Sequence, residues 1–261
     1  MIEAKLLEPR QIIASRRNTE LLYKAARELS IQIAQDNISL CKNVDVLILG
    51  VKPQGIRDVL LEIRDEMTCE LILSVAAGIS TSFIEDTLQK NIPVVRVMPN
   101  TPSLVQQGIS AFCPGKCASS DDMEIASDIL SGMGLAVKVS EDLLDPITAV
   151  SGTGPAYFFQ MAEGLINAAQ ELGLSEELAR LLVMETFAGA SALMRHRRVP
   201  PAELRAQVTS PGGTTEAAMT YLGERGFLRV FQDAVAHACA RSKELGLEAE
   251  QKDRGDSTAE E

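Results

Sequence analysis

The first 140 residues alternate between short apolar runs and segments whose apolar residues recur with helical spacing. Continuous apolar runs of this kind are typical of strands buried on both faces of a sheet. The predicted strands are residues 11–15, 31–34, 44–50, 71–75, 94–98 and 136–139. The predicted helices between them are residues 18–29, 54–65, 80–89 and 120–132. This alternation predicts an α/β fold, a doubly wound parallel sheet with helices on both faces.

The pattern changes near residue 145, where strand patterns stop and helical patterns continue to residue 245. Two predicted helices, residues 156–172 and 176–194, are apolar over nearly their whole surface, so they must be buried on all sides. A helical domain of about 100 residues cannot easily enclose them alone, which favours an intertwined dimer. We therefore expect a sheet domain at residues 1–144 and an all-α dimerisation domain at residues 145–246.

Composition limits the classes of binding partner and the cellular compartment that we expect. A net charge of −11 argues against a nucleic-acid partner, and the acidic residues 247–261 predict a disordered tail. No apolar run approaches the ~20 residues of a membrane span, and the N-terminus does not resemble a signal peptide. Five scattered cysteines without metal-ligand spacing predict free thiols, no metal site and a cytoplasmic protein.

The loops that follow the predicted strands are candidates for ligand binding, because such sheets bind ligands at the carboxyl ends of their strands. Three of these loops are short and contain Pro or small residues: residues 51–54, 76–78 and 99–102. They let a flat ligand lie close to the backbone. Ser15, Arg16 and Arg17 follow the first strand and suit a 2′-phosphate, hence NADP rather than NAD. The alternative is a set of ordinary turns with a solvated basic pair.

A dinucleotide fold should begin with a strand, a G-x-G-x-x-G loop and a helix. Residues 1–7 instead look like the second half of that first helix, and no such loop occurs elsewhere in the chain. We expect a truncated gene model that starts at an internal methionine, with genuine loss of cofactor binding as the alternative. We also expect an unpaired sheet edge beside residues 11–15 and 44–50.

A second candidate site is the loop Val208–Glu216, which contains Gly212 and Gly213 and opens onto a predicted helix. Glycines bring backbone N–H groups close to a ligand, and a helix N-terminus suits an anion. The hydroxyls of Thr214 and Thr215 lie where they could bind the same small ligand. The alternative is an ordinary helix cap with a tight turn.

With these motifs the chain resembles the pyrroline-5-carboxylate reductase family. The matching segments are residues 51–53, 74–78, 96–102, 151–157 and 208–215. The resemblance implies reduction of 1-pyrroline-5-carboxylate to L-proline, the last step of proline biosynthesis. It implies NADPH as the cofactor, with NADH as the alternative. It also implies a Rossmann-like domain, truncated here, followed by a helical domain that forms a homodimer or a ring of dimers.

The resemblance also implies roles for individual residues. Ser15, Arg16 and Arg17 would meet the 2′-phosphate, and Asn37 the nearby ribose. The other implied cofactor contacts are Gly50, Val51, Lys52, Pro53, Val75, Ala76, Ala77, Asn100 and Gln207. The implied substrate contacts are Glu141, Ser210, Gly213, Thr214 and Thr215, with the Thr215 hydroxyl facing the ring nitrogen as the catalytic group.

Two alternatives remain from the sequence. Another dehydrogenase of Rossmann-plus-helical type would use a helix-borne lysine as catalytic acid, and residues 156–194 contain no lysine. A cofactor-deficient pseudoenzyme or fragment that only oligomerises is supported by the missing glycine loop alone.

Overall fold

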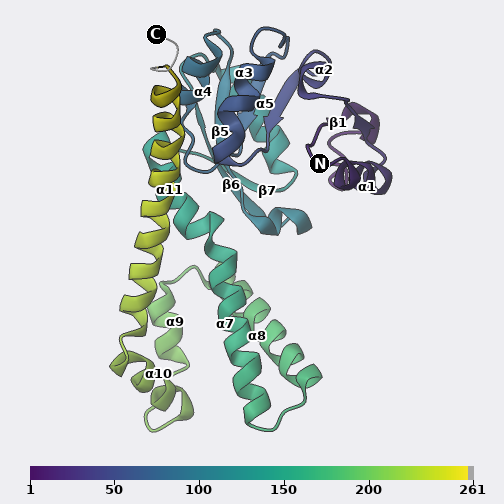
Figure 1. Cartoon of the computed structure of the whole chain (residues 1–261). Coiled ribbons are helices and arrows are strands. Elements are labelled where there is room, and N and C mark those ends of the chain that lie inside the picture. Colours follow the sequence, from purple (N-terminus) through teal and green to yellow (C-terminus); the bar gives the residue numbers. More distant parts are fainter. Residues whose placement is uncertain (258–261) are drawn as a thin grey trace. The chain divides into compact units, whose positions relative to one another are not determined.

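The computed structural model describes residues 1–257, with side chains described through residue 251. The chain divides into two compact units. The first contains Met1–Thr153 together with the chain from His237 onward, and the second is Gly154–Ala236. Figure 1 shows the sheet and its helices in the first unit and the helices of the second.

The first unit is built on a five-stranded sheet with the order β3-β4-β5-β6-β7. Its strands are β3 (Val46–Leu49), β4 (Leu71–Ser74), β5 (Val94–Met98), β6 (Gly108–Pro114) and β7 (Gly134–Lys138). The sequence did not predict β6, because Gly, Ser and Ala interrupt its apolar pattern. β6 runs antiparallel to β5, and β7 runs parallel to β6. The doubly wound fold is therefore confirmed, but the sheet is mixed rather than wholly parallel.

Helices cover both faces of this sheet. Ile72 of β4 packs with α3 and α4, whereas its neighbours Leu71 and Leu73 pack with α5. Successive side chains of a strand point to opposite faces, so a wholly apolar strand needs a helix on each side. The helices of this part are α1 (Thr19–Leu29), α2 (Asn37–Cys41), α3 (Ile56–Ile63), α4 (Thr81–Leu88), α5 (Ser120–Ser131) and α6 (Leu144–Ile147).

The first two strands do not join the large sheet. β1 (Ile13–Ala14) and β2 (Gln32–Ile33) pair with each other in parallel and form a separate two-stranded sheet. β3 consequently lies at one edge of the five-stranded sheet, and its Ile48 side chain is 44% exposed. The missing pairing between β1 and β3 matches the unpaired sheet edge that the sequence predicts beside residues 11–15 and 44–50.

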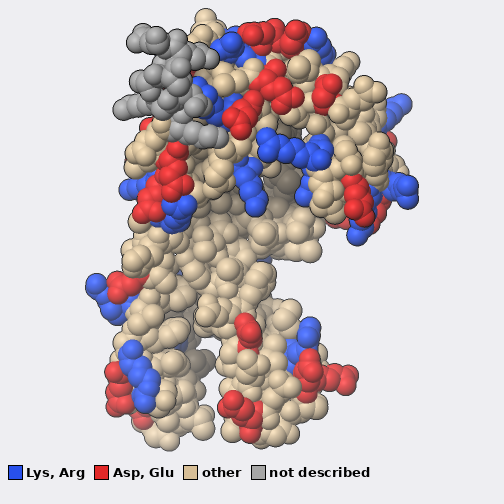
Figure 2. Space-filling model, viewed as in Figure 1, with Lys and Arg blue, Asp and Glu red and all other residues tan. Residues whose placement is uncertain are grey.

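The second unit contains helices and connecting loops. Its helices are α7 (Gly154–Glu171), α8 (Glu176–Arg197), α9 (Pro201–Gln207), α10 (Thr214–Glu224) and the beginning of α11 (Phe227–Ser257). Several large apolar side chains of α7 and α8 face outward, including Phe159 at 68% and Met184 at 63% exposure. On the face seen in Figure 2, the helices of this unit carry few charged residues away from their ends. The long apolar helices of the prediction are confirmed.

The C-terminal segment differs from the prediction. α11 continues as a helix to Ser257, through most of the expected tail, and the chain from His237 onward belongs to the first unit. Arg241 pairs with Glu244 and Glu248 along the helix, and Ala249 is buried, so Glu244 and Glu248 lie on an exposed face of a packed helix. Residues 258–261 lie outside the described residues. None of the described helices is both long and apolar enough to cross a membrane.

Candidate functional site

Three of the predicted cofactor loops lie at one edge of the sheet. The parallel strands β3, β4 and β5 end at Leu49, Ser74 and Met98, and Leu49 is in register with Ser74. The loops that follow carry Gly50 to Pro53, Val75 to Ala77, and Asn100. A side chain at Gly50 would meet no protein atom within 4 Å, so the backbone there faces open space. This edge of the sheet has the arrangement that the sequence predicts for a bound dinucleotide.

The candidate 2′-phosphate residues gather where β1 ends and α2 begins. The Ser15 hydroxyl donates a hydrogen bond of 2.8 Å to the Asn37 side-chain oxygen, across 22 positions of sequence. The Asn37 amide nitrogen donates to Glu62 of α3 at 2.9 Å, and Glu62 was not predicted. Arg16 and Arg17 are exposed and form no ion pair with the described part of the chain. Their guanidinium groups are available to an anion.

Asn100 holds two loops together. Its side-chain oxygen accepts a hydrogen bond from the N–H of Ile109 at 2.9 Å, and its amide nitrogen donates to the Ser151 hydroxyl at 3.4 Å. The side chain therefore fixes the backbone after β5. Its part in cofactor binding remains a prediction.

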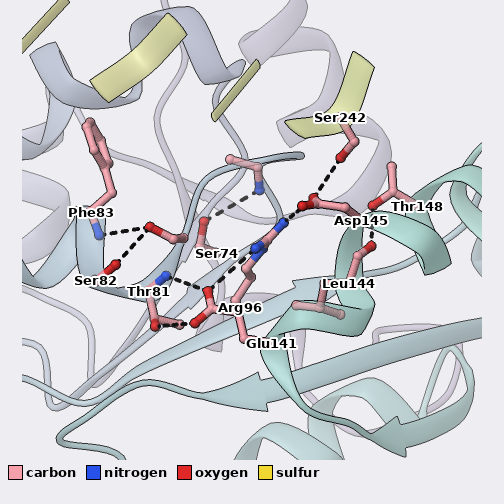
Figure 3. A network of polar contacts seen from close by, with 12 residues as sticks. Ser74, Thr81, Ser82, Phe83, Arg96, Glu141, Leu144, Asp145, Thr148 and Ser242 are labelled. Atoms are coloured by element: carbon pink, nitrogen blue, oxygen red, sulfur yellow. Dashed lines mark hydrogen bonds and ion pairs between the residues drawn. The ribbon is translucent and has the colours of Figure 1, made fainter. Parts of the chain in front are cut away.

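A buried arginine, missed by the sequence analysis, lies in the centre of β5. The Arg96 side chain is 6% exposed, and its Nη2 atom lies 2.9 Å from Asp145 and its Nη1 atom 3.5 Å from Glu141. Figure 3 shows the guanidinium between these two carboxylates. Both pairings compensate the loss of water around a buried charge. The signal was present in the sequence, because a charged residue interrupts the apolar run Val94–Met98.

Glu141 was predicted to contact the substrate, and its carboxylate is engaged within this network. Oε1 accepts the N–H of Thr81 at 2.8 Å and pairs with Arg96, and Oε2 accepts the Thr81 hydroxyl at 2.8 Å. Glu141 thus joins the 3₁₀ turn Glu141–Leu143 to the start of α4.

Two cysteines near the sheet, Cys113 and Cys69, have raised pKa values. Burial, with a smaller contribution from the nearby Glu141 carboxylate, raises the pKa of Cys113 to about 12. Burial likewise raises the pKa of Cys69 to about 11. Both thiols therefore stay protonated at neutral pH, and neither supplies a thiolate nucleophile.

The loop between α9 and α10 forms a tight turn. The N–H of Gly213 donates to the Ser210 carbonyl at 3.0 Å, and Gly212 has φ +72°, a conformation that glycine adopts without strain. A Cβ at Gly213 would lie 2.5 Å from the Ser210 hydroxyl, so a side chain there would displace that hydroxyl. Because the Gly213 N–H is engaged, it is not available to the substrate carboxylate.

Thr214 and Thr215 begin α10, whose N-cap is Gly213. The N–H groups of a first helical turn have no carbonyl partner within the helix, and they lie at the positive end of its dipole. Gly213 brings no side chain to cap them. The structure therefore presents two backbone donors and the Thr215 hydroxyl together at one helix end.

Gln207 is the last residue of α9 and is exposed, and its amide nitrogen lies 3.2 Å from the Glu203 carboxylate. It belongs to the second unit together with the loop Val208–Glu216, whereas the other predicted cofactor residues belong to the first.

Comparison with known proteins finds two family models that match separate segments of the chain. The family model described as "Pyrroline-5-carboxylate reductase dimerisation" matches residues 141–245. The model described as "NADP oxidoreductase coenzyme F420-dependent" matches residues 1–78. The solved structure of Plasmodium falciparum pyrroline carboxylate reductase with NADP bound has a TM-score of 0.86 and 29% identity, covering 94% of this chain and 91% of that one. The structure of the Coxiella burnetii pyrroline-5-carboxylate reductase has a TM-score of 0.80 and 37% identity, covering 93% and 91%.

Curated relatives agree with the structures. Pyrroline-5-carboxylate reductase of Pseudomonas aeruginosa is 40% identical over 237 residues, which cover 90% of this chain and 87% of that protein. The enzyme of Methanosarcina acetivorans is 39% identical over 246 residues, which cover 94% of this chain and 91% of that protein. The chain belongs to the pyrroline-5-carboxylate reductase family.

Proposed function

We propose that this chain reduces 1-pyrroline-5-carboxylate to L-proline with NADPH, the last step of proline biosynthesis. The observation that carries the proposal is the loop Ser210–Thr215, which presents backbone donors and a threonine hydroxyl at one helix N-terminus. A small cyclic imine with a carboxylate matches this arrangement, since the anion and the ring nitrogen need separate partners.

The residues of the first unit fit NADPH. Arg16, Arg17 and the bonded pair Ser15–Asn37 offer cationic and neutral donors suited to a 2′-phosphate and its ribose. The open backbone at Gly50 and the small, half-buried Ala77 suit a flat ligand, and the buried Ala76 would offer only its backbone. NADPH supplies a hydride when it is bound. The basic pair favours NADPH, and NADH remains the alternative cofactor.

The second unit would hold the substrate. The N–H groups of Thr214 and Thr215 would bind the carboxylate, with the Ser210 hydroxyl beside them and Gly213 maintaining the turn. The Thr215 hydroxyl would hydrogen-bond to the ring nitrogen, which must carry a proton for the imine carbon to be electrophilic. The contribution of the protein is chiefly to position two bound molecules.

The Glu141 carboxylate has protein partners of its own, so we propose that it supports the substrate site through them rather than by direct contact. Both of its carboxylate oxygens are bonded to Thr81 and Arg96. We assign Glu141 to maintaining the network around Arg96.

The exposed apolar side chains of α7 and α8 support a homodimer, since each Å² of apolar surface left in water costs about 25 cal/mol. The match of residues 141–245 to the family's dimerisation model supports the same assembly. We propose an intertwined dimer, with a ring of dimers as the larger form, in the cytoplasm, where the five free cysteines stay reduced. A single monomeric species in analytical ultracentrifugation would contradict the dimer.

The function is tested by incubating the purified chain with NADPH and 1-pyrroline-5-carboxylate and measuring NADPH consumption together with proline. We expect one proline for each NADPH oxidised, and no turnover of 2-hydroxy-acid or 2-keto-acid substrates. A dimer that binds no NADPH and makes no proline would favour the oligomerising pseudoenzyme.

A further inference from the structure

The turn after β4 contacts α11 through backbone atoms. Gly78 has φ +78°, and a Cβ there would lie 2.3 Å from the Ser242 carbonyl oxygen and 2.9 Å from the Gly246 nitrogen. In return, a Cβ at Gly246 would lie 2.4 Å from the Gly78 carbonyl oxygen. Neither position has room for a side chain. The turn and the helix are therefore as close as two glycines permit.

Ser242, whose carbonyl oxygen lies against Gly78, also fixes α11 through its side chain. The buried Ser242 hydroxyl donates to Asp145 at 2.9 Å, and the same carboxylate oxygen pairs with Arg96 at 2.9 Å (Figure 3). Arg96 lies on β5, in register with Ser74, the residue that ends β4. The turn is thus held between the strand that precedes it and the helix that covers it.

Ser242, Gly246 and Ala249 are spaced to share one face of α11, and Ser242 and Ala249 are buried. This face belongs to the same compact unit as the turn, although α11 begins in the other unit at Phe227. Movement of this face would displace the backbone from Val75 to Gly78. Val75 to Ala77 of this stretch are the proposed cofactor contacts after β4.

We propose that Ser242 and Gly246 of α11 are positioning residues for the cofactor-binding turn Val75–Gly78. The inference rests on the proposed function, which assigns Val75 to Ala77 to NADPH. It extends that function by giving the last helix a part in cofactor affinity, although its own side chains do not touch the cofactor.

Two substitutions test this inference in the full-length chain. Ser242→Ala removes the hydroxyl without adding bulk, and Gly246→Ala places a methyl group against the Gly78 carbonyl. We expect each to raise the Kd for NADPH, measured by nucleotide fluorescence, by about tenfold. The KM for 1-pyrroline-5-carboxylate at saturating NADPH should stay within a factor of about two, because the substrate loop is untouched. Lys243→Ala, an exposed position between the two, is the matched control and should bind NADPH normally.

The outcomes separate positioning from general stability. Folded variants with a wild-type Kd would overturn the inference, and so would a lower Tm with unchanged NADPH affinity. If Gly246→Ala does not fold, the NADPH affinity of Ser242→Ala decides whether α11 positions the turn. Ala77→Leu, which obstructs the turn directly, tests the assignment on which the inference rests, namely that this turn contacts NADPH. If Ala77→Leu binds NADPH normally, the proposed cofactor contact is wrong; if it alone weakens binding, only the role of α11 is wrong.

Discussion

The Glu216 carboxylate accepts a hydrogen bond of 2.7 Å from the backbone N–H of Gly212. Glu216 is the third residue of α10, so this bond ties the turn before the helix to the helix itself. Its negative charge also lies near the positive end of the helix dipole. The same charge lies near the two N–H groups proposed to bind the substrate carboxylate. Glu216 therefore has two opposing effects, ordering the loop and repelling an anion.

Variants of Glu216 separate these effects. Glu216→Ala removes the acceptor, and loss of a charge-assisted hydrogen bond worth about 1.5–3 kcal/mol should loosen the turn and raise the KM for the imine about tenfold or more. Glu216→Gln keeps an acceptor oxygen but removes the charge, so its KM should equal or fall below the wild-type value. Steady-state kinetics measures both, with the exposed Glu224→Ala of the same helix as control. Equal KM values for the Ala and Gln variants would contradict this account.

The Thr215 hydroxyl should matter for turnover and not for cofactor binding. Thr215→Ala should cost about 1–3 kcal/mol of transition-state stabilisation and so lower kcat/KM for the imine roughly fivefold to 150-fold. Thr215→Ser keeps the hydroxyl and should restore most of the activity. The Kd for NADPH should be the same in all three proteins. An unchanged kcat/KM in Thr215→Ala would remove this residue from the mechanism.

The sequence predicts the fold best where an element depends on a local run of apolar residues. Apolar runs located β3, β4 and β5, and Ser15 and Asn37, which the family resemblance assigns to neighbouring parts of one nucleotide, are hydrogen-bonded to each other. It failed where a residue's role depends on distant partners. Arg96 needs Asp145, 49 positions away, and Gly78 needs Gly246 of the last helix, so neither contact follows from local spacing.

Two other failures have local causes. β6 was missed because small residues break its apolar pattern, although all but two of its seven residues are buried. The end of α11 was predicted as a tail because charge dominates its composition. Helix formation there depends on a narrow buried face, which Ala249 marks.

The Arg96 network should be important for stability. Arg96→Leu leaves the Asp145 and Glu141 carboxylates without their cation, and breaking such a buried pair typically costs about 3–5 kcal/mol. Arg229→Ala removes an exposed ion pair with Asp233 and should cost at most about 1 kcal/mol. Urea unfolding, followed by circular dichroism, compares the two variants. Similar losses in both would show that the buried network contributes no more than a surface pair.

The buried thiols predict a loss of stability at alkaline pH. The pKa values of Cys69 and Cys113 are raised from 9.0 to about 11 and about 12 in the folded protein. Above pH 9.0 the unfolded chain therefore releases protons that the folded chain retains. Unfolding then becomes easier as pH rises, by about 1.4 kcal/mol per pH unit for each thiol until its folded pKa is reached.

This prediction is checked by urea unfolding at pH 8 and at pH 10.5 under reducing conditions. The wild-type protein should lose more free energy of unfolding between the two conditions than the double variant Cys69→Ala/Cys113→Ala. The comparison within each protein cancels the cavity that the substitutions leave, because that cavity does not depend on pH. An equal loss in both proteins would show that the pKa values of these two thiols are the same in the folded and unfolded states.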